Sequence, residues 1–436
     1  MVGDLRLRLT ATALAGLVAA SATCSPALAA SPAASAPVES PAPGAGATAL
    51  ENPAPWVGDS VRAEQWHLKT LNVAGAWNFA NGAGVTVAVI DSGVDANHVD
   101  LAGQVLPGLD LVDPKGNGDT DLVGHGTTVS AIIAGRSDDS SGVVGIAPKA
   151  KILPVRVLDE ENRYDDAMIV AKGVRWAVDH GARVINLSLG GNGSSAALAA
   201  ALDYAFAKDV VVVACTGNTS ASSSAGVWYP AREPGVLAVA GMEKDGNALW
   251  LGSITGKETV VTAPATALVG ARPDNGYWHV QGTSFAAPMV SATAALVRSR
   301  WPTMSAAEVI NRIIKTATDR GAPGRDSTYG FGMVDPTGAL TAEVPAVATN
   351  PLDNTPDPGI ARFGNAPASG QAQSAPDKAV AGATSGTRVS GANAGSVIPG
   401  SEPGASSARG WWAAGLLFLL SVLVGLVTVR RFASVT

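Results

Sequence analysis

Three short segments of this 436-residue chain carry the residue types of a nucleophile and of the proton-transfer groups that would activate it. Asp91 stands directly after the apolar run V-T-V-A-V-I, His125 lies in V-G-H-G-T-T-V, and Ser284 lies in Q-G-T-S-F-A-A-P-M. A serine hydroxyl is weakly nucleophilic alone, and it gains reactivity when a histidine removes its proton and a carboxylate orients that histidine. We choose His125 as the general base because none of the other histidines has glycine on both sides.

Each of these residues also has a plain structural interpretation. An aspartate before Ser-Gly is ordinary turn chemistry, a histidine can cap a helix, and a serine before a helix-forming stretch is a typical N-cap. The two interpretations of Ser284 agree if Thr283 takes the cap position, because the serine hydroxyl is then free to face His125. Pro288 has no N–H to bond back to the Ser284 carbonyl, so we expect a loosened first turn where the nucleophile lies.

Alternating strands and helices must position these residues. Apolar, β-branched runs predict buried parallel strands, and helical periodicity predicts helices between or after them. The predicted strands are 85–90, 152–158, 183–187, 210–214 and 236–240, and the predicted helices are 126–135, 165–180, 195–208, 285–300 and 305–317, the last opened by a capping box of Ser305 and Glu308. The pattern indicates an α/β domain whose reactive residues gather at the carboxyl ends of strands.

The order of the reactive residues along the chain separates the classes of serine hydrolase. An α/β-hydrolase needs its histidine after its serine, but every histidine here precedes Ser284, and no G-x-S-x-G surrounds that serine. A chymotrypsin-like protease has the order His, Asp, Ser and an all-β fold, whereas this chain alternates strands with helices. The order Asp, His, Ser remains, which is the order of the subtilisins.

Three motifs in that order resemble the active-site motifs of the subtilisin-like serine proteases: D-S-G-V at 91–94, G-H-G-T at 124–127 and G-T-S-F-A-A-P at 282–288. The resemblance extends over most of residues 84–340, which we take as the catalytic domain. It implies a subtilisin-like three-layer α/β fold with a central, mostly parallel sheet. It also implies a serine endopeptidase with an Asp91, His125 and Ser284 triad.

The same resemblance suggests roles for residues outside the triad. Asn218, in A-C-T-G-N, matches the oxyanion residue of the family, although it also reads as a turn residue after a glycine. Ser188, Leu189 and Gly190 match the extended segment that pairs with the main chain of a protein or peptide substrate, although S-L-G-G could be only a strand end.

The two ends of the chain predict export and membrane anchoring. Two arginines, an apolar stretch and A-L-A at 27–29 are typical of a signal peptide, here residues 1–29. Residues 410–429 carry no charge and would form a helix of about 30 Å, enough to span a bilayer. Two arginines follow, which places the tail, 430–436, in the cytoplasm and the bulk of the chain outside. We therefore expect a single-pass protein of the cell membrane.

Two segments flank the predicted catalytic domain. Residues 341–409 are rich in Pro, Gly, Ser and Ala and indicate a linker, because they cannot bury enough apolar area to fold. Residues 30–83 form an N-terminal extension with too few apolar residues for a compact folding-assisting propeptide. We expect this extension to stay attached and to pack through Trp56, Trp66 and Trp77.

This arrangement of segments resembles the mycosins, membrane-anchored proteases of actinobacterial type VII secretion systems. The resemblance implies a type VII secretion membrane complex as a partner. Mycobacterial mycosins carry cysteine pairs, whereas here Cys24 leaves with the signal peptide and Cys215 has no partner. A scaffold that stabilises a secretion complex, with protease activity secondary, and a general surface-tethered protease stay open as alternatives.

Composition sets aside other classes of function. The net charge is -6 and no long basic run occurs, which argues against nucleic-acid binding. No cofactor or metal is expected. Four aspartates could bind a cation, but they lack EF-hand spacing and a solvated loop is favoured over a calcium site; they are Asp110, Asp113, Asp119 and Asp121.

Overall fold

The computed structural model describes residues 47–49, 60–138, 141–164, 166–219, 226–244 and 246–353. The predicted signal peptide, most of the predicted linker, the predicted membrane helix and the tail lie outside these residues. Within the described ranges, none of the helices combines the length and the apolar character needed to cross a bilayer.

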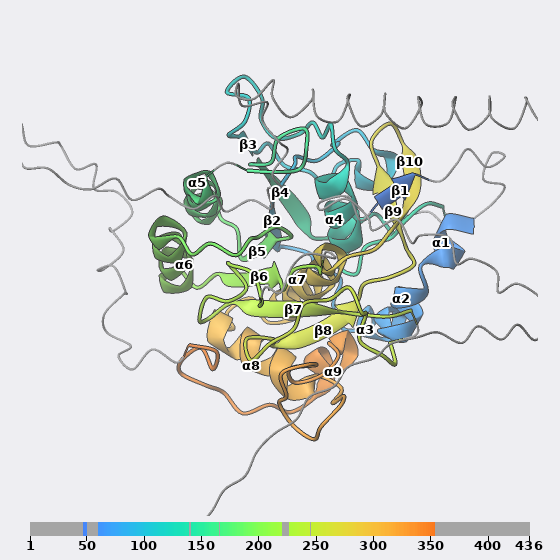
Figure 1. The fold of residues 1–436 in the computed structure, drawn as a ribbon. Helices are drawn as coiled ribbons and strands as arrows, with labels where there is room; N and C mark the ends of the chain where they lie inside the picture. Colours follow the sequence, from blue (N-terminus) through green and yellow to red (C-terminus); the bar gives the residue numbers. More distant parts are fainter. Residues whose placement is uncertain are drawn as a thin grey trace, which may run out of the picture. The chain divides into compact units, whose positions relative to one another are not determined.

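A seven-stranded parallel sheet forms the centre of the domain (Figure 1). Its strands run in the order β3-β4-β2-β5-β6-β7-β8, and all neighbours pair in parallel. Their bounds are β2 (Thr86–Asp91), β3 (Leu109–Asp110), β4 (Lys151–Arg156), β5 (Val184–Leu187), β6 (Val211–Cys215), β7 (Leu237–Met242) and β8 (Val261–Pro264). The five predicted strands are all present, because continuous apolar runs are what a sheet covered on both faces requires.

Helices cover both faces of this sheet. Figure 1 shows α5 (Ala167–Asp179) and α6 (Ala196–Ala207) on one side, and α4 (His125–Ala134) and α7 (Thr283–Arg300) on the other. Every residue of α4 is buried, although the helix carries polar side chains as well as apolar ones. The helix α8 (Ala306–Thr316) begins with the predicted capping box, and α9 (Pro336–Thr341) follows it. The predicted three-layer α/β arrangement is confirmed.

The patterns did not predict a second, smaller sheet. The strands β9 (Leu268–Arg272) and β10 (Gly276–Val280) form an antiparallel hairpin, and β1 (Ala47–Ala49) pairs with β10. Each of these strands has five residues or fewer, and β10 is mostly only partly buried, so it lacks a continuous apolar run. Short helices of the extension were also missed, namely α1 (Ser60–Glu64), α2 (Trp66–Thr70) and α3 (Val73–Ala76).

The described part of the N-terminal extension packs against the catalytic domain, as predicted for two of its tryptophans. The Trp66 indole donates to the carbonyls of Thr266 and Ala267 at 3.2 and 2.9 Å. The Trp77 indole donates to the Ile146 carbonyl at 2.9 Å. Trp56 lies outside the described residues.

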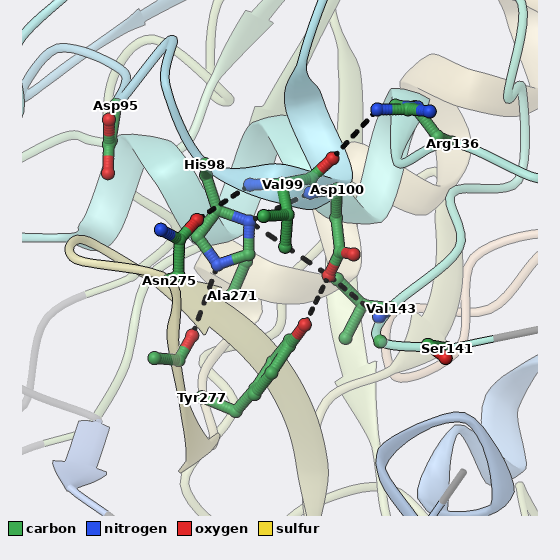
Figure 2. A network of polar contacts seen from close by, with 12 residues as sticks. Asp95, His98, Val99, Asp100, Arg136, Ser141, Val143, Ala271, Asn275 and Tyr277 are labelled. Carbon is green, nitrogen blue, oxygen red and sulfur yellow. Dashed lines mark hydrogen bonds and ion pairs between the residues drawn. The ribbon is translucent and has the colours of Figure 1, made fainter. Parts of the chain in front are cut away.

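A buried polar network fastens the hairpin to two loops of the catalytic domain (Figure 2). The Asp100 carboxylate, in the short helix η1 (Val99–Leu101), accepts hydrogen bonds from the Tyr277 hydroxyl and the Val143 N–H, both at 2.9 Å. Nδ1 of His98 accepts from the Asp100 N–H at 3.1 Å, so its Nε2 carries the proton and donates to the Gly276 carbonyl at 3.2 Å. The network thus holds β10 in place from one side.

The hairpin in turn supports the helix that begins with His125. The Trp278 indole of β10 donates to the Thr128 hydroxyl at 2.7 Å, and that hydroxyl donates to the Ala271 carbonyl of β9 at 2.6 Å. Because Thr128 lies in the first turn of α4, the hairpin fixes the position of that turn.

Candidate active site

The fold brings Asp91 and His125 into direct contact. Asp91 is the last residue of β2 and is fully buried, and His125 is the first residue of α4. Nδ1 of His125 donates to Oδ1 of Asp91 at 2.7 Å, and the Ser92 N–H donates to the same oxygen at 2.8 Å. A Cβ on Gly126 would lie 2.0 Å from the Gly93 carbonyl oxygen, so glycine is needed for this close approach. With its proton on Nδ1, the imidazole keeps Nε2 as a proton acceptor.

The surroundings of His125 favour its charged form. Burial alone would lower the pKa of His125, but the charge and hydrogen bond of Asp91, together with the charge of Asp121, raise that pKa above its ordinary value. An imidazolium formed during a reaction would therefore be stabilised here.

Asp121 is a buried carboxylate beside the histidine, and the prediction of a solvated loop is wrong for it. Its Oδ1 accepts from the Ser92 hydroxyl at 2.9 Å and from the N–H groups of Val123 and Gly124 at 3.0 and 2.8 Å. Its Oδ2 accepts from the N–H and hydroxyl of Thr127 at 2.9 and 2.7 Å. Asp121 therefore ties the loop after β2 to the first turn of α4.

The partners of Asp121 act as donors to an ionised carboxylate. The Ser92 hydroxyl accepts from the Gly126 N–H at 3.0 Å, and the Thr127 hydroxyl accepts from the Asp95 N–H at 2.9 Å, so both hydroxyls have their protons available for Asp121. Burial raises the pKa of Asp121, and its hydrogen bonds with Thr127 and Gly124 oppose that rise.

The prediction of a solvated loop is also wrong for Asp110. This aspartate is buried, and its carboxylate pairs with the Arg156 guanidinium at 3.2 Å.

The start of α7, which carries Ser284, packs against the histidine through Phe285. Ser284 is the second residue of the helix and is partly exposed, and the ring of the following Phe285 lies 5.2 Å from the ring of His125. The predicted cap at Thr283 is wrong: Gly282 is the N-cap, with φ of 146°. Thr283 lies inside the helix because its hydroxyl and N–H both donate to Oδ1 of Asn218, at 2.9 and 3.0 Å.

These two bonds also orient the Asn218 amide. Asn218 follows β6 in the chain, and its oxygen is engaged by Thr283. The donor end of the amide, Nδ2, therefore remains for another acceptor near the helix start. The N–H of Ser284 belongs to the first helical turn, whose N–H groups have no partner within the helix. The two donors predicted for an oxyanion hole thus come from neighbouring elements.

The segment Ser188, Leu189 and Gly190 follows β5 and lies against the nucleophile. The Ser188 hydroxyl donates to the main-chain carbonyl of Ser284 at 2.6 Å. On its other side, the segment continues into Gly191, which exchanges two main-chain hydrogen bonds with Tyr229 at 3.0 and 2.8 Å. The segment is therefore fixed at both ends next to Ser284.

Cys215 is the one other potential nucleophile at this position. Its thiol lies beside Thr283 and Ser284, but burial raises the pKa of Cys215 to about 11. Because the thiolate is the reactive form, this cysteine is inert near neutral pH. It is a core residue, as its apolar sequence context indicates.

A serine beside a buried Asp–His pair, on a parallel sheet with helices on both faces, defines the class of subtilisin-like serine endopeptidases. The comparison with known protein families agrees. The model of the subtilase family, which describes peptidases, matches residues 82–332, more than half of the chain. This chain belongs to the subtilase family.

Its relatives include subtilisins and mycosins of known structure. Subtilisin DY of Bacillus licheniformis is 39% identical over 256 residues, which cover 58% of this chain and 90% of that protein. MycP1 from Mycobacterium smegmatis matches with a TM-score of 0.59 and 30% identity, over 70% of this chain and 90% of that one. The MycP3 protease from the type VII (ESX-3) secretion system matches with a TM-score of 0.58 and 32% identity, over 64% and 88%. The expected likeness to the mycosins is confirmed.

Proposed function

We propose that this protein is a membrane-anchored, extracytoplasmic endopeptidase that works through Asp91, His125 and Ser284 and acts with a type VII secretion system. The observation that carries the catalytic part is the 2.7 Å bond between His125 and Asp91 with Ser284 at the neighbouring helix start. The secretion role is supported by the likeness to MycP3, a protease from the type VII (ESX-3) secretion system.

Each group of the triad has a defined step in peptide hydrolysis. Oγ of Ser284 attacks the substrate carbonyl carbon while Nε2 of His125 takes the hydroxyl proton, and Asp91 stabilises the imidazolium that forms. The imidazolium then gives this proton to the leaving amine, which leaves an acyl-enzyme. His125 then takes a proton from a water molecule, whose oxygen attacks the acyl carbon, and gives that proton to Oγ of Ser284 as the ester bond breaks and the acid product leaves.

Two further parts of the site act on the substrate. Asn218 Nδ2 and the Ser284 N–H donate to the oxyanion that develops on the attacked carbonyl. The main chain of Ser188, Leu189 and Gly190 adds a strand-like partner for the substrate, so that main-chain hydrogen bonds give affinity and side-chain pockets give choice. This favours an extended peptide as substrate.

The membrane part of the proposal rests on the sequence. A signal peptide at 1–29 exports the chain, residues 84–340 lie outside, and a helix at 410–429 anchors them through the linker 341–409, with 430–436 in the cytoplasm. The extension, 30–83, remains attached to the domain. Membrane association is tested by carbonate extraction of the full chain, and removal of residues 410–436 should release it.

A fluorophosphonate probe tests the catalytic part. We expect the purified protein to be labelled and the Ser284→Ala variant to remain unlabelled, because the probe reacts only with an activated serine. Absence of labelling, or labelling that survives Ser284→Ala, overturns the assignment of the nucleophile. In cells, secretion that survives Ser284→Ala but is lost on deletion of the chain would favour the scaffold function over proteolysis.

A further inference from the structure

The helix α7 contains a proline where the carbonyl of Ser284 would find its helical partner. In an α-helix, this carbonyl accepts a hydrogen bond from the N–H four residues later, and here that residue is Pro288, which has none. A main-chain carbonyl that is shielded from water and has no hydrogen-bond partner costs free energy, and the surroundings of this carbonyl are partly buried. In this structure the hydroxyl of Ser188 takes the position, donating at 2.6 Å from a side chain that is only 3% exposed.

The Ser188 hydroxyl is itself held by a chain of buried hydrogen bonds. The Ser291 hydroxyl donates to Oδ1 of Asn186 at 2.8 Å, and Nδ2 of Asn186 donates to the Ser188 hydroxyl at 2.9 Å. Ser291 and Asn186 are fully buried. The Ser188 oxygen accepts the hydrogen bond from the Asn186 amide, so its own proton points to the Ser284 carbonyl. Hydrogen bonds in such a series strengthen one another.

This series of hydrogen bonds joins three elements whose relative positions the reaction requires to be fixed. Ser291 lies in α7 two turns after the nucleophile, Asn186 lies in the central strand β5, and Ser188 begins the segment that would receive the substrate. We propose that the Ser188 hydroxyl positions the nucleophile, replacing the N–H that Pro288 lacks and fastening the Ser284 main chain to the substrate-binding segment. Ser188 is a positioning residue, and this role rests on the proposed role of Ser284.

Two features of the site depend on that contact. Oγ of Ser284 moves with its own main chain, and the Ser284 N–H is one of the two proposed oxyanion donors. A shift of the first turn of α7 would therefore misplace the attacking atom and the oxyanion donor together. The loosened first turn expected from Pro288 is compensated by a side chain that is distant in the sequence.

The test removes the hydroxyl and then restores an N–H. Ser188→Ala should slow fluorophosphonate labelling and lower kcat by about tenfold, the equivalent of one buried hydrogen bond. KM for a peptide should change little, because the main-chain groups of the segment remain. Adding Pro288→Ala to Ser188→Ala returns an N–H to the Ser284 carbonyl, so the double variant should recover most of the labelling rate.

A matched control lies in the same helix. The Thr293 hydroxyl donates to the Met289 carbonyl at 2.8 Å and is fully buried, so Thr293→Val removes a bond of the same kind away from Ser284. We expect Thr293→Val to label at the wild-type rate. Thermal unfolding of each variant identifies misfolding, and if Ser188→Ala unfolds, Ser188→Cys provides the same test with a weaker donor of similar size.

The outcomes separate this inference from the proposed function. An unlabelled wild-type protein refutes the nucleophile itself. A wild-type protein that labels, together with a folded Ser188 variant that labels equally fast, refutes the positioning role alone. That role also fails if Pro288→Ala does not restore the labelling of the Ser188 variant, or if Thr293→Val slows labelling as much.

Discussion

The helices α4 and α7 both begin beside the carboxyl end of the sheet with a reactive residue, yet their first turns are held by different chemistry. Each has glycine as its N-cap and no side-chain cap of its own. At α4, the Asp121 carboxylate accepts from the N–H groups of the turn. At α7, the neutral amide of Asn218 does the same, and the Ser188 hydroxyl binds the Ser284 carbonyl.

The two anchors differ in charge because opposite charges develop beside the two helix starts during the reaction. His125 becomes positive during proton transfer, and a buried carboxylate nearby stabilises that charge. The substrate oxygen beside Ser284 becomes negative, and a carboxylate there would repel it in a site of low dielectric. We infer that a charged anchor suits α4 and that only neutral anchors suit α7.

The largest expected effect comes from changing the anchor of α7. Asn218→Ala removes an oxyanion donor and should lower kcat about a hundred- to a thousandfold, the loss known from the corresponding change in subtilisin, with KM little altered. Asn218→Asp keeps the size and places a charge where the oxyanion forms, so its kcat should be lower still. Steady-state kinetics decide, and an aspartate variant faster than the alanine variant would contradict the charge argument.

A smaller effect is expected from neutralising the anchor of α4. Asp121→Asn should cost about tenfold in the plateau of kcat/KM through lost hydrogen bonds. The pH profile is the sharper measurement. The charged groups that raise the pKa of His125 are Asp91 and Asp121, and burial opposes them. Removing one charge lowers that pKa, and since His125 must be neutral to act as a base, the acid limb of kcat/KM should move to lower pH.

A surface aspartate supplies the control for this shift. Asp138 is exposed and pairs with Arg136, so solvent screens its charge, and Asp138→Asn should leave the acid limb of kcat/KM where it is. An acid limb that stays in place or moves to higher pH in Asp121→Asn would show that the carboxylate acts only as a structural tether.

The reactive residues of α4 and α7 could be predicted from the sequence, whereas the groups that anchor these helices could not. Asp91, His125 and Ser284 stand in local motifs beside long apolar runs, and such patterns are readable because strands covered on both faces must be continuously apolar. The anchors depend on contacts between distant segments: Asn218 meets Thr283, and Ser188 meets Ser284. Local propensity favours a hydroxyl residue, Ser284 or Thr283, as the cap, whereas the contact of Thr283 with Asn218 places both residues inside the helix and leaves Gly282 as the N-cap.

The position of Asp121 in the sequence carries a local signal of its role. It lies four residues before His125, close enough for its carboxylate to reach the N–H groups at the start of α4. This spacing to His125 distinguishes Asp121 from Asp110 and Asp113, which lie farther from the start of α4. The hairpin of β9 and β10 has no comparable signal, because both strands are short and β10 is mostly only partly buried, so it shows no distinct apolar pattern.

The helix α8 serves as a control for α4 and α7, because residues of its own first turn cap its start and that start takes no part in the proposed reaction. The Ser305 hydroxyl accepts from the Glu308 N–H at 3.2 Å, and Glu308 accepts from the Ser305 N–H at 3.0 Å. Ser305→Ala should lower the free energy of unfolding by about 1 kcal/mol and leave kcat unchanged. Chemical denaturation and kinetics on the same sample measure both. If kcat fell with stability, the losses at Asn218 and Asp121 could reflect helix loosening rather than charge, and the contrast between the two anchors would lose its basis.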